Sequence, residues 1–329
     1  MLAESPPVEL PVPPVAEGYS RLPLAAFWEA HRPQAALYLQ PAPHAAPRLL
    51  CKRGYELSDA HLEELVGRGV QSLFIANSEL SDVANSLLES LDGILASERI
   101  APHDRAAILQ VAEAPALESA LVAIDAGRSI ATAERIAARM ARLLSETEVD
   151  ARSLYSALQH DDRASVRAYN GAAYAVVLAL LLELVAPTQA AELAVGAMLR
   201  DLGERFIPSA ILGKRGRNSH AERELIESHP TRGYVELRRR GGLTTEQLLI
   251  VYQHHECFSG GGYPVGVLAD EIHPWAQATA VVDAFDGLTG WRSYRAALDA
   301  VTALRQIEAS AYSQFNPEMV RCWSNAILI

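Results

Sequence analysis

The sequence predicts a mainly α-helical protein, in which a small α+β domain and a helical linker precede a C-terminal all-α bundle. Two observations support this prediction. Three short runs typical of β-strands fall before residue 78, and from Glu79 onward the spacing of apolar residues is helical almost everywhere. With 329 residues, half of them hydrophobic, the chain is long enough for about two domains, which excludes wholesale disorder.

The predicted segments follow one another along the chain. They are a proline-rich lead-in (1–20), the small α+β domain (21–95), the helical linker (96–150) and the bundle (151–329). The strand-like runs are Ala36–Gln40, Arg48–Arg53 and Gln71–Ala76. Ser58 is placed to cap a helix between the last two runs, since its hydroxyl can accept a hydrogen bond from a backbone N–H.

The linker contains an amphipathic stretch, Ala131–Leu144, with Ile136, Met140 and Leu143 on one side. Such a stripe has two interpretations. It either packs a connecting helix onto the next domain, or it forms a dimerising or signal-transmitting helix, so a homodimer stays open.

The charge pattern excludes one class of function. A net charge of −11 argues against non-specific binding to duplex nucleic acid, which needs a broad basic surface. A local arginine cluster can still hold a small anion. Three scattered cysteines, Cys51, Cys257 and Cys322, indicate reduced thiols in a cytoplasmic protein rather than a disulfide framework.

We expect neither a secretory signal nor a membrane span. Met1–Pro14 lacks a basic start and an apolar core. The most apolar stretch, Ala172–Leu182, ends at Glu183 and falls short of the roughly 20 residues that a span needs. It is therefore interpreted as a buried core helix.

A histidine pair marks the first candidate for chemistry. His254, His255 and Glu256 end a helical run, and the glycine-rich segment Gly260–Pro264 follows. Two adjacent histidines can reach one cation only where the helix unwinds, and glycines allow such a turn. A solvated surface pair is the alternative.

The longer segment HHECFSGGGYPVGVLADEIHPWAQATAVVDAFDGLTGWRSYR (His254–Arg295) closely resembles the HD-GYP family of cyclic-di-GMP phosphodiesterases. That family shows HHExxDGxGYPxGL, then a helix with an aspartate and an R-P-Y-R/K element. Met198–Lys214 is similar to its LLHDIGK-x-x-IP-x-x-IL-x-K pattern, and Glu227–Gly233 to its H-P-x-x-G pattern. The resemblance covers about residues 155–325.

The resemblance implies a helical bundle that binds two or three metal ions, often iron or manganese, where a bridging hydroxide attacks a phosphodiester. It also implies the ligands. Asp201, His229, His254 and His255 would surround one ion, and Asp283 would belong to the other.

Four positions depart from the family pattern. Arg200 stands where the family has the histidine of its HD pair, and an earlier helix histidine falls at Ala168 in our alignment. Glu204 replaces a lysine, and Ser259 replaces the aspartate of the DGxGYP loop. Two ligands of the same ion are therefore missing.

Arginine cannot be a metal ligand, because its guanidinium stays protonated and carries only donors. We therefore predict that Arg200 is a metal-replacing cation whose donors face Asp201 or Asp283. The alternative is a local pair with Glu204, four residues on, that turns Arg200 aside.

Three metal contents remain open: one Fe, Mn or Zn ion, no ion, or two. The preferred function is a non-hydrolytic member of the family that acts as a regulator, sensor or interaction module in bacterial cyclic-di-GMP signalling. The alternatives are an active metal-dependent phosphodiesterase, in which Asp201 would be catalytic, and a ligand-free dimerisation scaffold.

Other residues carry weaker signals. Arg292, Tyr294 and Arg295 match the R-P-Y-R element and could bind a nucleotide phosphate, or they form a helix-terminal charge cluster. In the family the loop Gly260, Gly261, Gly262, Tyr263 and Pro264 is a docking surface for signalling domains such as GGDEF cyclases, so a protein partner is expected there. The basic turn formed by Lys214, Arg215 and Arg217 is either solvated or contacts a ligand.

Overall fold

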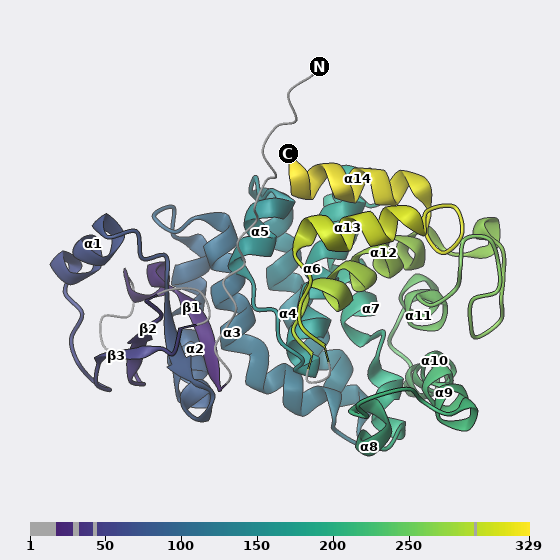
Figure 1. Ribbon diagram of the computed structural model, residues 1–329, viewed down its shortest axis with the longest axis horizontal. Helices are drawn as coiled ribbons and strands as arrows, with labels where there is room; N and C mark the ends of the chain where they lie inside the picture. The colour runs from purple at the N-terminus through teal and green to yellow at the C-terminus, as the bar shows by residue number, and fades with distance from the viewer. Residues whose placement is uncertain (1–17, 29–32, 42–44, 293–294) are drawn as a thin grey trace.

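The computed structural model describes residues 18–28, 33–41, 45–292 and 295–329. A small sheet with one helix lies at one end of the molecule, and a large bundle of helices forms the rest (Figure 1). The predicted fold class, mainly α with a small α+β region first, is confirmed.

The sheet has four antiparallel strands in the order β1-β4-β2-β3. They are β1 (Tyr19–Pro23), β2 (Leu37–Leu39), β3 (Arg48–Cys51) and β4 (Ser72–Ala76). The last three are the strands that the sequence predicted, each slightly shorter. β1 was missed, because its five residues were assigned partly to the lead-in, yet Tyr19 pairs with Ala76 and Pro23 with Ser72.

The helix α1 (Asp59–Gly67) begins where the sequence predicts. The Ser58 side chain accepts a hydrogen bond from the backbone N–H of His61, and Leu62 and Leu65 are buried. The other elements of this region are η1 (Leu24–Trp28), η2 (Asn77–Glu79) and α2 (Leu80–Ala96).

The segment expected to be a linker forms two long helices, α3 (Pro102–Leu121) and α4 (Ala126–Glu146), that pack into the bundle. The apolar side of α4, including Ile136 and Met140, is buried against α7 and α3. This is the packing role that we weighed for the amphipathic stripe.

The remaining helices complete the bundle. They are α5 (Ala151–Ala157), α6 (Ala164–Leu181), η3 (Pro187–Gln189), α7 (Ala190–Leu199), η4 (Leu202–Phe206), α8 (Ser209–Leu212), α9 (His220–Glu227), α10 (His229–Arg240), α11 (Thr245–Gln253), η5 (Ala269–Glu271), α12 (Pro274–Thr289), α13 (Ala300–Ala309) and α14 (Pro317–Leu328).

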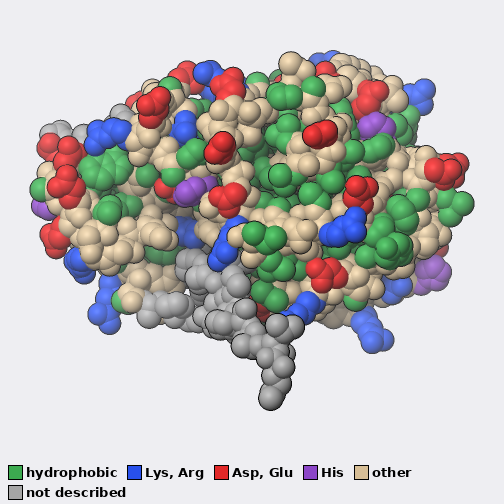
Figure 2. Space-filling view, turned by 90° about the horizontal axis from the view of Figure 1, so that it is seen from above, with side chains coloured by type: hydrophobic (Ala, Val, Ile, Leu, Met, Phe, Trp, Pro, Cys, Tyr) green, Lys and Arg blue, Asp and Glu red, His purple; other side chains and the backbone are tan. Residues whose placement is uncertain are grey.

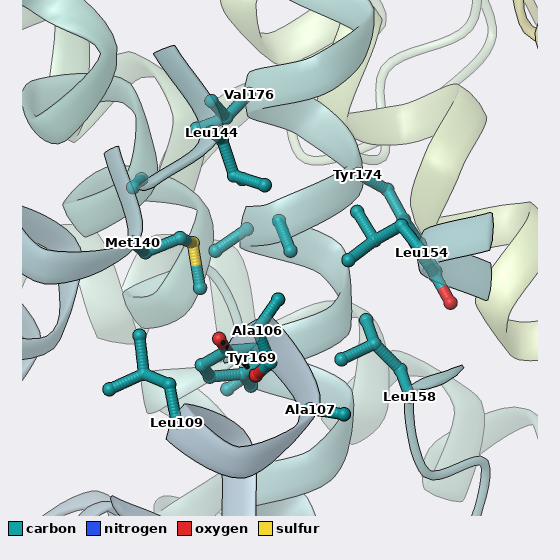
Figure 3. Close-up of a cluster of buried hydrophobic side chains, with 14 of the residues drawn as sticks. Ala106, Ala107, Leu109, Met140, Leu144, Leu154, Leu158, Tyr169, Tyr174 and Val176 are labelled. Carbon is teal, nitrogen blue, oxygen red and sulfur yellow. Dashed lines mark hydrogen bonds between the residues drawn. The ribbon is translucent and has the colours of Figure 1, made fainter. Parts of the chain in front are cut away.

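The core forms where α3, α4, α5 and α6 meet. Side chains from all four helices converge there, among them Leu109, Met140, Leu154 and Tyr169 (Figure 3). The buried Tyr169 hydroxyl donates a hydrogen bond to the carbonyl of Ala106 at 2.8 Å, so this polar group has a partner inside the core.

The helix α6 runs through the middle of the bundle (Figure 1). By length and composition it is the one helix in the described part of the chain that could cross a membrane, but 78% of it is buried inside the protein. Core helices of folded proteins have this same character. On the surface, acidic and basic side chains are interspersed, and Figure 2 shows no continuous basic area on the face that it presents.

Candidate metal centre

Four side chains converge on one point in the bundle. One ligand atom from each of Asp201, His229, His254 and His255 lies within 4.8 Å of the other three. The Nε2 atoms of His229 and His254 are 3.3 Å apart and lie 3.6 and 3.5 Å from Oδ1 of Asp201. These are the four residues that the resemblance assigned to one ion.

Close backbone packing brings two of these ligands together. Asp201 precedes η4 and His229 begins α10, and the two elements touch at Gly203 and Gly233. A Cβ on Gly203 would lie 2.8 Å from the backbone nitrogen of Gly233 and still closer to the carbonyl oxygen of His229. Only glycine therefore allows the approach that places Asp201 beside His229.

The histidine pair lies where a helix ends, as the sequence argument required. The helix α11 stops at Gln253, and His254 is its C-cap. The following loop is held by Glu256, whose carboxylate accepts hydrogen bonds from the backbone N–H groups of Val265 at 2.8 Å and Gly266 at 2.9 Å. The two adjacent imidazoles thus reach the same point.

The protonation pattern of the histidines fits a cation. Nδ1 of His229 lies 2.8 Å from the carbonyl oxygen of Ile226, and Nδ1 of His254 lies 3.0 Å from that of Val251. A carbonyl can only accept, so both Nδ1 atoms carry a proton, and in a neutral imidazole this leaves Nε2 with a lone pair. Two lone pairs and a carboxylate oxygen that face one another without a donor repel, and a metal ion removes that repulsion.

The surroundings also keep these groups in the ligand form. Burial, and then the neighbouring His254, lower the pKa of His229 to about 4, and the same causes hold the pKa of His255 well below its usual value. Burial opposes ionisation of Asp201, but Arg200, His254 and Arg167 together outweigh it and hold the pKa of that carboxyl well below its usual range. Neutral imidazoles with one carboxylate suit Fe, Mn or Zn.

Arg200 lies beside this cluster with its side chain 1% exposed. Its Nε and Nη2 donate to Oδ1 of Asp283 at 2.9 and 2.5 Å, and Nε lies 3.4 Å from Oδ2 of Asp201. Nη1 donates to the carbonyl of Ala197. Burial opposes its charge, but Asp283 and Asp201 raise the pKa of Arg200 overall. The guanidinium therefore faces the two carboxylates that we named for it.

Helix α6 provides the space for this side chain. A Cβ on Gly171 would lie 2.8 Å from Cζ of Arg200 and closer still to Nη1. One turn earlier, the carbonyl of Arg167 accepts a hydrogen bond from Nη2 of Arg200 at 3.2 Å. No local pattern in the sequence indicated that Gly171 makes room for Arg200, because Gly171 lies in α6 and Arg200 follows α7.

The alternative pairing of Arg200 with Glu204 is wrong. The helix α7 ends at Leu199, and the chain continues as a 3-10 turn, so the two residues do not share an i, i+4 face. Glu204 instead accepts from Nη2 of Arg167 at 2.6 Å. Burial, and then Asp201, raise the pKa of Glu204 against the opposing effect of Arg167.

Beneath the centre lies a buried polar network that the sequence analysis missed. Ala168, where we expected the missing histidine, is buried and offers no ligand atom. Two residues later, Asn170 donates to Oδ1 of Asp286 at 2.7 Å and accepts from Nε2 of Gln110 at 2.6 Å. An asparagine within an otherwise apolar helix, as at Asn170, is a signal that the sequence analysis could have used.

The residues proposed for nucleotide binding have mixed outcomes. Arg295 donates to the carbonyls of Gly287, Leu288 and Ala296, which is the helix-terminal arrangement that we set against phosphate binding. Arg292 forms a backbone bridge with Arg295. Tyr294 lies outside the described residues.

The glycine-rich loop differs from expectation at its aromatic residue. Tyr263 was expected to be exposed for a partner, but it is half-buried and stacks on His255 with 4.8 Å between ring centroids. A Cβ on Gly262 would lie 2.5 Å from Cα of Glu256, so the loop folds back onto the histidine pair. Gly260 and Pro264 are half-buried and Gly261 is exposed.

The basic turn is mainly solvated. Nζ of Lys214 contacts the Glu222 carboxylate at 2.6 Å, and Arg215 and Arg217 are exposed.

Comparison with known proteins gives the family. A model of the HD domain matches residues 117–319. The chain is similar to the cyclic di-GMP phosphodiesterase PA4108 of Pseudomonas aeruginosa, with 31% identity over 46% of this chain and 36% of that protein. It is also similar to the cyclic di-GMP phosphodiesterase response regulator RpfG of Xanthomonas campestris, with 34% identity over 38% of this chain and 33% of that protein.

A third relative is named for another nucleotide. The 3'3'-cGAMP-specific phosphodiesterase 3 of Vibrio cholerae is 31% identical over 40% of this chain and 28% of that protein. The chain thus matches about a third of the length of these relatives. Among solved structures, Bd1817, a HDG"Y"P protein from Bdellovibrio bacteriovorus, has a TM-score of 0.64 at 16% identity, covering 93% of this chain and 98% of that one. This likeness supports the fold.

Proposed function

This chain belongs to the HD domain family, and on that premise we propose that it is a non-hydrolytic member that acts as a regulator or sensor in bacterial cyclic-di-GMP signalling. Relatives named as cyclic di-GMP phosphodiesterases support the signalling system. The observation that carries the non-hydrolytic part is the buried guanidinium of Arg200 on Asp283 and Asp201.

The charges around the centre favour one metal ion. Five charged side chains contact one another there: Arg167, Arg200, Asp201, Glu204 and Asp283. Two are cations and three are anions, so together they carry one negative charge. One divalent ion would change the net charge from −1 to +1. Two divalent ions would leave a net charge of +3 in a partly buried site.

Repulsion makes a second ion beside Arg200 costly. Unit charges about 4 Å apart interact by roughly 4 kcal/mol at an effective dielectric constant of about 20, and a dication doubles this figure. The guanidinium also forms a hydrogen-bonded ion pair with Asp283, the carboxylate that the resemblance assigned to the second ion. We infer that Arg200 takes the place of that ion.

The remaining groups suit binding better than hydrolysis. A single ion held by Asp201, His229, His254 and His255 supplies an electrophile for one phosphate oxygen. Glu204 places an anion close by, although Arg167 neutralises it in part. Loss of one transition-state donor typically lowers a rate by about 10²–10³, and loss of a second metal removes more.

Three measurements on the purified full chain test the proposal: elemental analysis, hydrolysis of cyclic-di-GMP and 3'3'-cGAMP with Mn²⁺ or Fe²⁺, and calorimetric titration of both nucleotides. We expect one metal ion per chain, no pGpG or GMP, and heat on titration. Two ions together with product would establish an active phosphodiesterase and overturn the proposal. No ion and no heat would instead support the scaffold alternative.

A further inference from the structure

A buried arginine joins the N-terminal sheet to the bundle. Arg21, on β1, is 5% exposed, and its Nη2 donates to the carbonyls of Ser156, Ala157 and Leu158 at 2.7, 2.9 and 2.6 Å. These carbonyls form the C-terminal end of α5, where a helix carries partial negative charge. Within the described part of the chain, no carboxylate pairs with Arg21. One guanidinium therefore ties β1 to the C-terminal end of α5, in addition to the packing of β1 and η1 on α3.

The next residue, Gln159, bonds to β1 and the bundle at once. Its Oε1 accepts from the backbone N–H of Arg21 at 3.2 Å, and its Nε2 donates to the carbonyl of Arg21. Its own N–H donates to Oε1 of Gln110 at 2.8 Å, and its carbonyl accepts from Nδ2 of Asn170 at 2.8 Å. The Gln159 side chain, 3% exposed, thus links the backbone of β1 by hydrogen bonds to the helices of the bundle.

The far end of this path is the helix turn that holds Arg200. Asn170 also bonds to Gln110 and to Asp286, so its amide is bonded on both sides. Gly171, the next residue, leaves space for the Arg200 guanidinium. The carbonyl of Arg167 accepts a hydrogen bond from that guanidinium. Direct hydrogen bonds and one helix turn therefore connect Arg21 to Arg200.

The bonding side chains of this network are shielded from solvent. Arg21, Gln110, Gln159, Asn170 and Arg200 are all buried and bond to protein partners, so a shift of β1 meets protein groups rather than water.

We propose that Arg21, acting through Gln159, is a positioning residue by which docking of the N-terminal sheet controls the metal centre: β1 seated by Arg21 fixes the α6 turn under Arg200 and strengthens metal binding. This inference rests on the proposed single-ion site and names its regulation.

The first test needs no metal. In the full chain we compare Arg21→Met with the matched control Arg53→Met, which removes an exposed ion pair to Asp82 in the same domain. Hydrogen exchange measured by mass spectrometry should be at least threefold faster around residues 156–172 in Arg21→Met and unchanged in the control. Helix α11 should keep its rate in both. Equal acceleration in α11 would indicate general destabilisation and overturn the proposal.

The second test reads the metal centre. Arg21→Met should weaken Mn²⁺ binding by about 5- to 20-fold, within the range known for coupled sites, and Arg53→Met by less than twofold. By reciprocity, Mn²⁺ should slow exchange at β1 in the unaltered chain, a readout that survives if Arg21→Met fails to fold. Unchanged affinity together with unchanged exchange at β1 would refute the coupling. If the unaltered chain binds no Mn²⁺, the single-ion proposal fails, while the metal-free comparison still decides the coupling.

Discussion

The two halves of the candidate site solve the same electrostatic problem in opposite ways. On one side, Asp201 and the imidazoles of His229 and His254 turn acceptors toward one another with no donor between them. On the other side, Asp283 meets the donors of Arg200 directly. The first half can take a cation from solution, whereas the second already contains the covalently attached guanidinium of Arg200.

Under the proposed function, this difference would let one pocket keep a metal ligand set without a second ion. A covalently attached charge cannot dissociate, and its cost is lowered because carbonyls of Ala197 and Arg167 accept the remaining donors. Under the proposed single-ion site, the exchangeable half, formed by Asp201 and the histidines, would respond to metal concentration. The following experiments test this contrast, from the largest expected effect to the smallest.

Removing the covalent cation should destabilise the protein most. Arg200→Met leaves Asp283 without its partner inside the site, and loss of one member of a buried pair costs about 3–5 kcal/mol. Urea unfolding with a chelator present measures this change. The control Arg142→Met breaks an exposed pair with Glu146 and should cost less than about 0.5 kcal/mol. If the two variants lose equal stability, the Arg200 contacts contribute nothing net.

A carboxylate without a cation of its own should show the opposite pH dependence from an ion-paired one. Burial raises the pKa of Asp286 to about 6, against the opposing effects of Arg292 and Asn170. The folded chain therefore binds more protons than the unfolded chain between pH 4 and 6, so this contribution to stability is lost as pH rises through 6.

The loss amounts to about 3 kcal/mol at most. Asp286→Asn removes the titration, so its stability relative to the unaltered chain should rise by that amount between pH 4 and 8. His160, whose pKa burial lowers to about 4, acts in the opposite direction but is present in both proteins. A stability difference that stays constant with pH would contradict the assignment.

Metal affinity should separate the two halves directly. His255→Ala removes a ligand of the exchangeable half and should weaken Mn²⁺ binding by about 100-fold, at least the loss typical of supporting residues at metal sites. Asp283→Asn removes no ligand of that half and acts only through Arg200, so it should weaken Mn²⁺ binding by no more than about 20-fold, the limit expected for displacing Arg200. Calorimetry measures both. Comparable losses would show that Asp283 is also a ligand and that Arg200 has not displaced the second ion.

The smallest effect should come from the space that α6 leaves for Arg200. A methyl group at Gly171 would force the guanidinium aside, so Gly171→Ala should cost about 1–3 kcal/mol. Gly93→Ala, in the interior of α2 with nothing within 4 Å of the added carbon, should instead gain up to about 1 kcal/mol. In the Arg200→Met background, Gly171→Ala should cost much less stability than it does in the unaltered chain. Additive losses in that double variant would show that the two residues do not interact.

Much of the fold could be predicted from the sequence because its signals are local. Ser58 marked the start of α1, and three of the four strands followed from short apolar runs. The strand β1 was missed because its pattern, with Arg21 in the middle and Pro23 at the end, is not that of a strand. Its burial comes from pairing with β4 and from the helix end that receives Arg21.

For the site, the sequence by itself determined the chemistry of the ligands. The histidine pair His254 and His255, and the helix end that carries it, follow from residue type and spacing, whereas Asp201 and His229 were assigned by the family resemblance. Their convergence, however, rested on a family resemblance, because they come from three elements.

Only the tertiary structure decided where the long side chains point. Arg200 turned to Asp283 on α12, Glu204 to Arg167 on α6, and Tyr263 back onto His255. Such side chains have several rotatable bonds, so their neighbours in sequence do not fix their direction. Partners far away in the chain, and the space left by a glycine on another helix, select one direction among many.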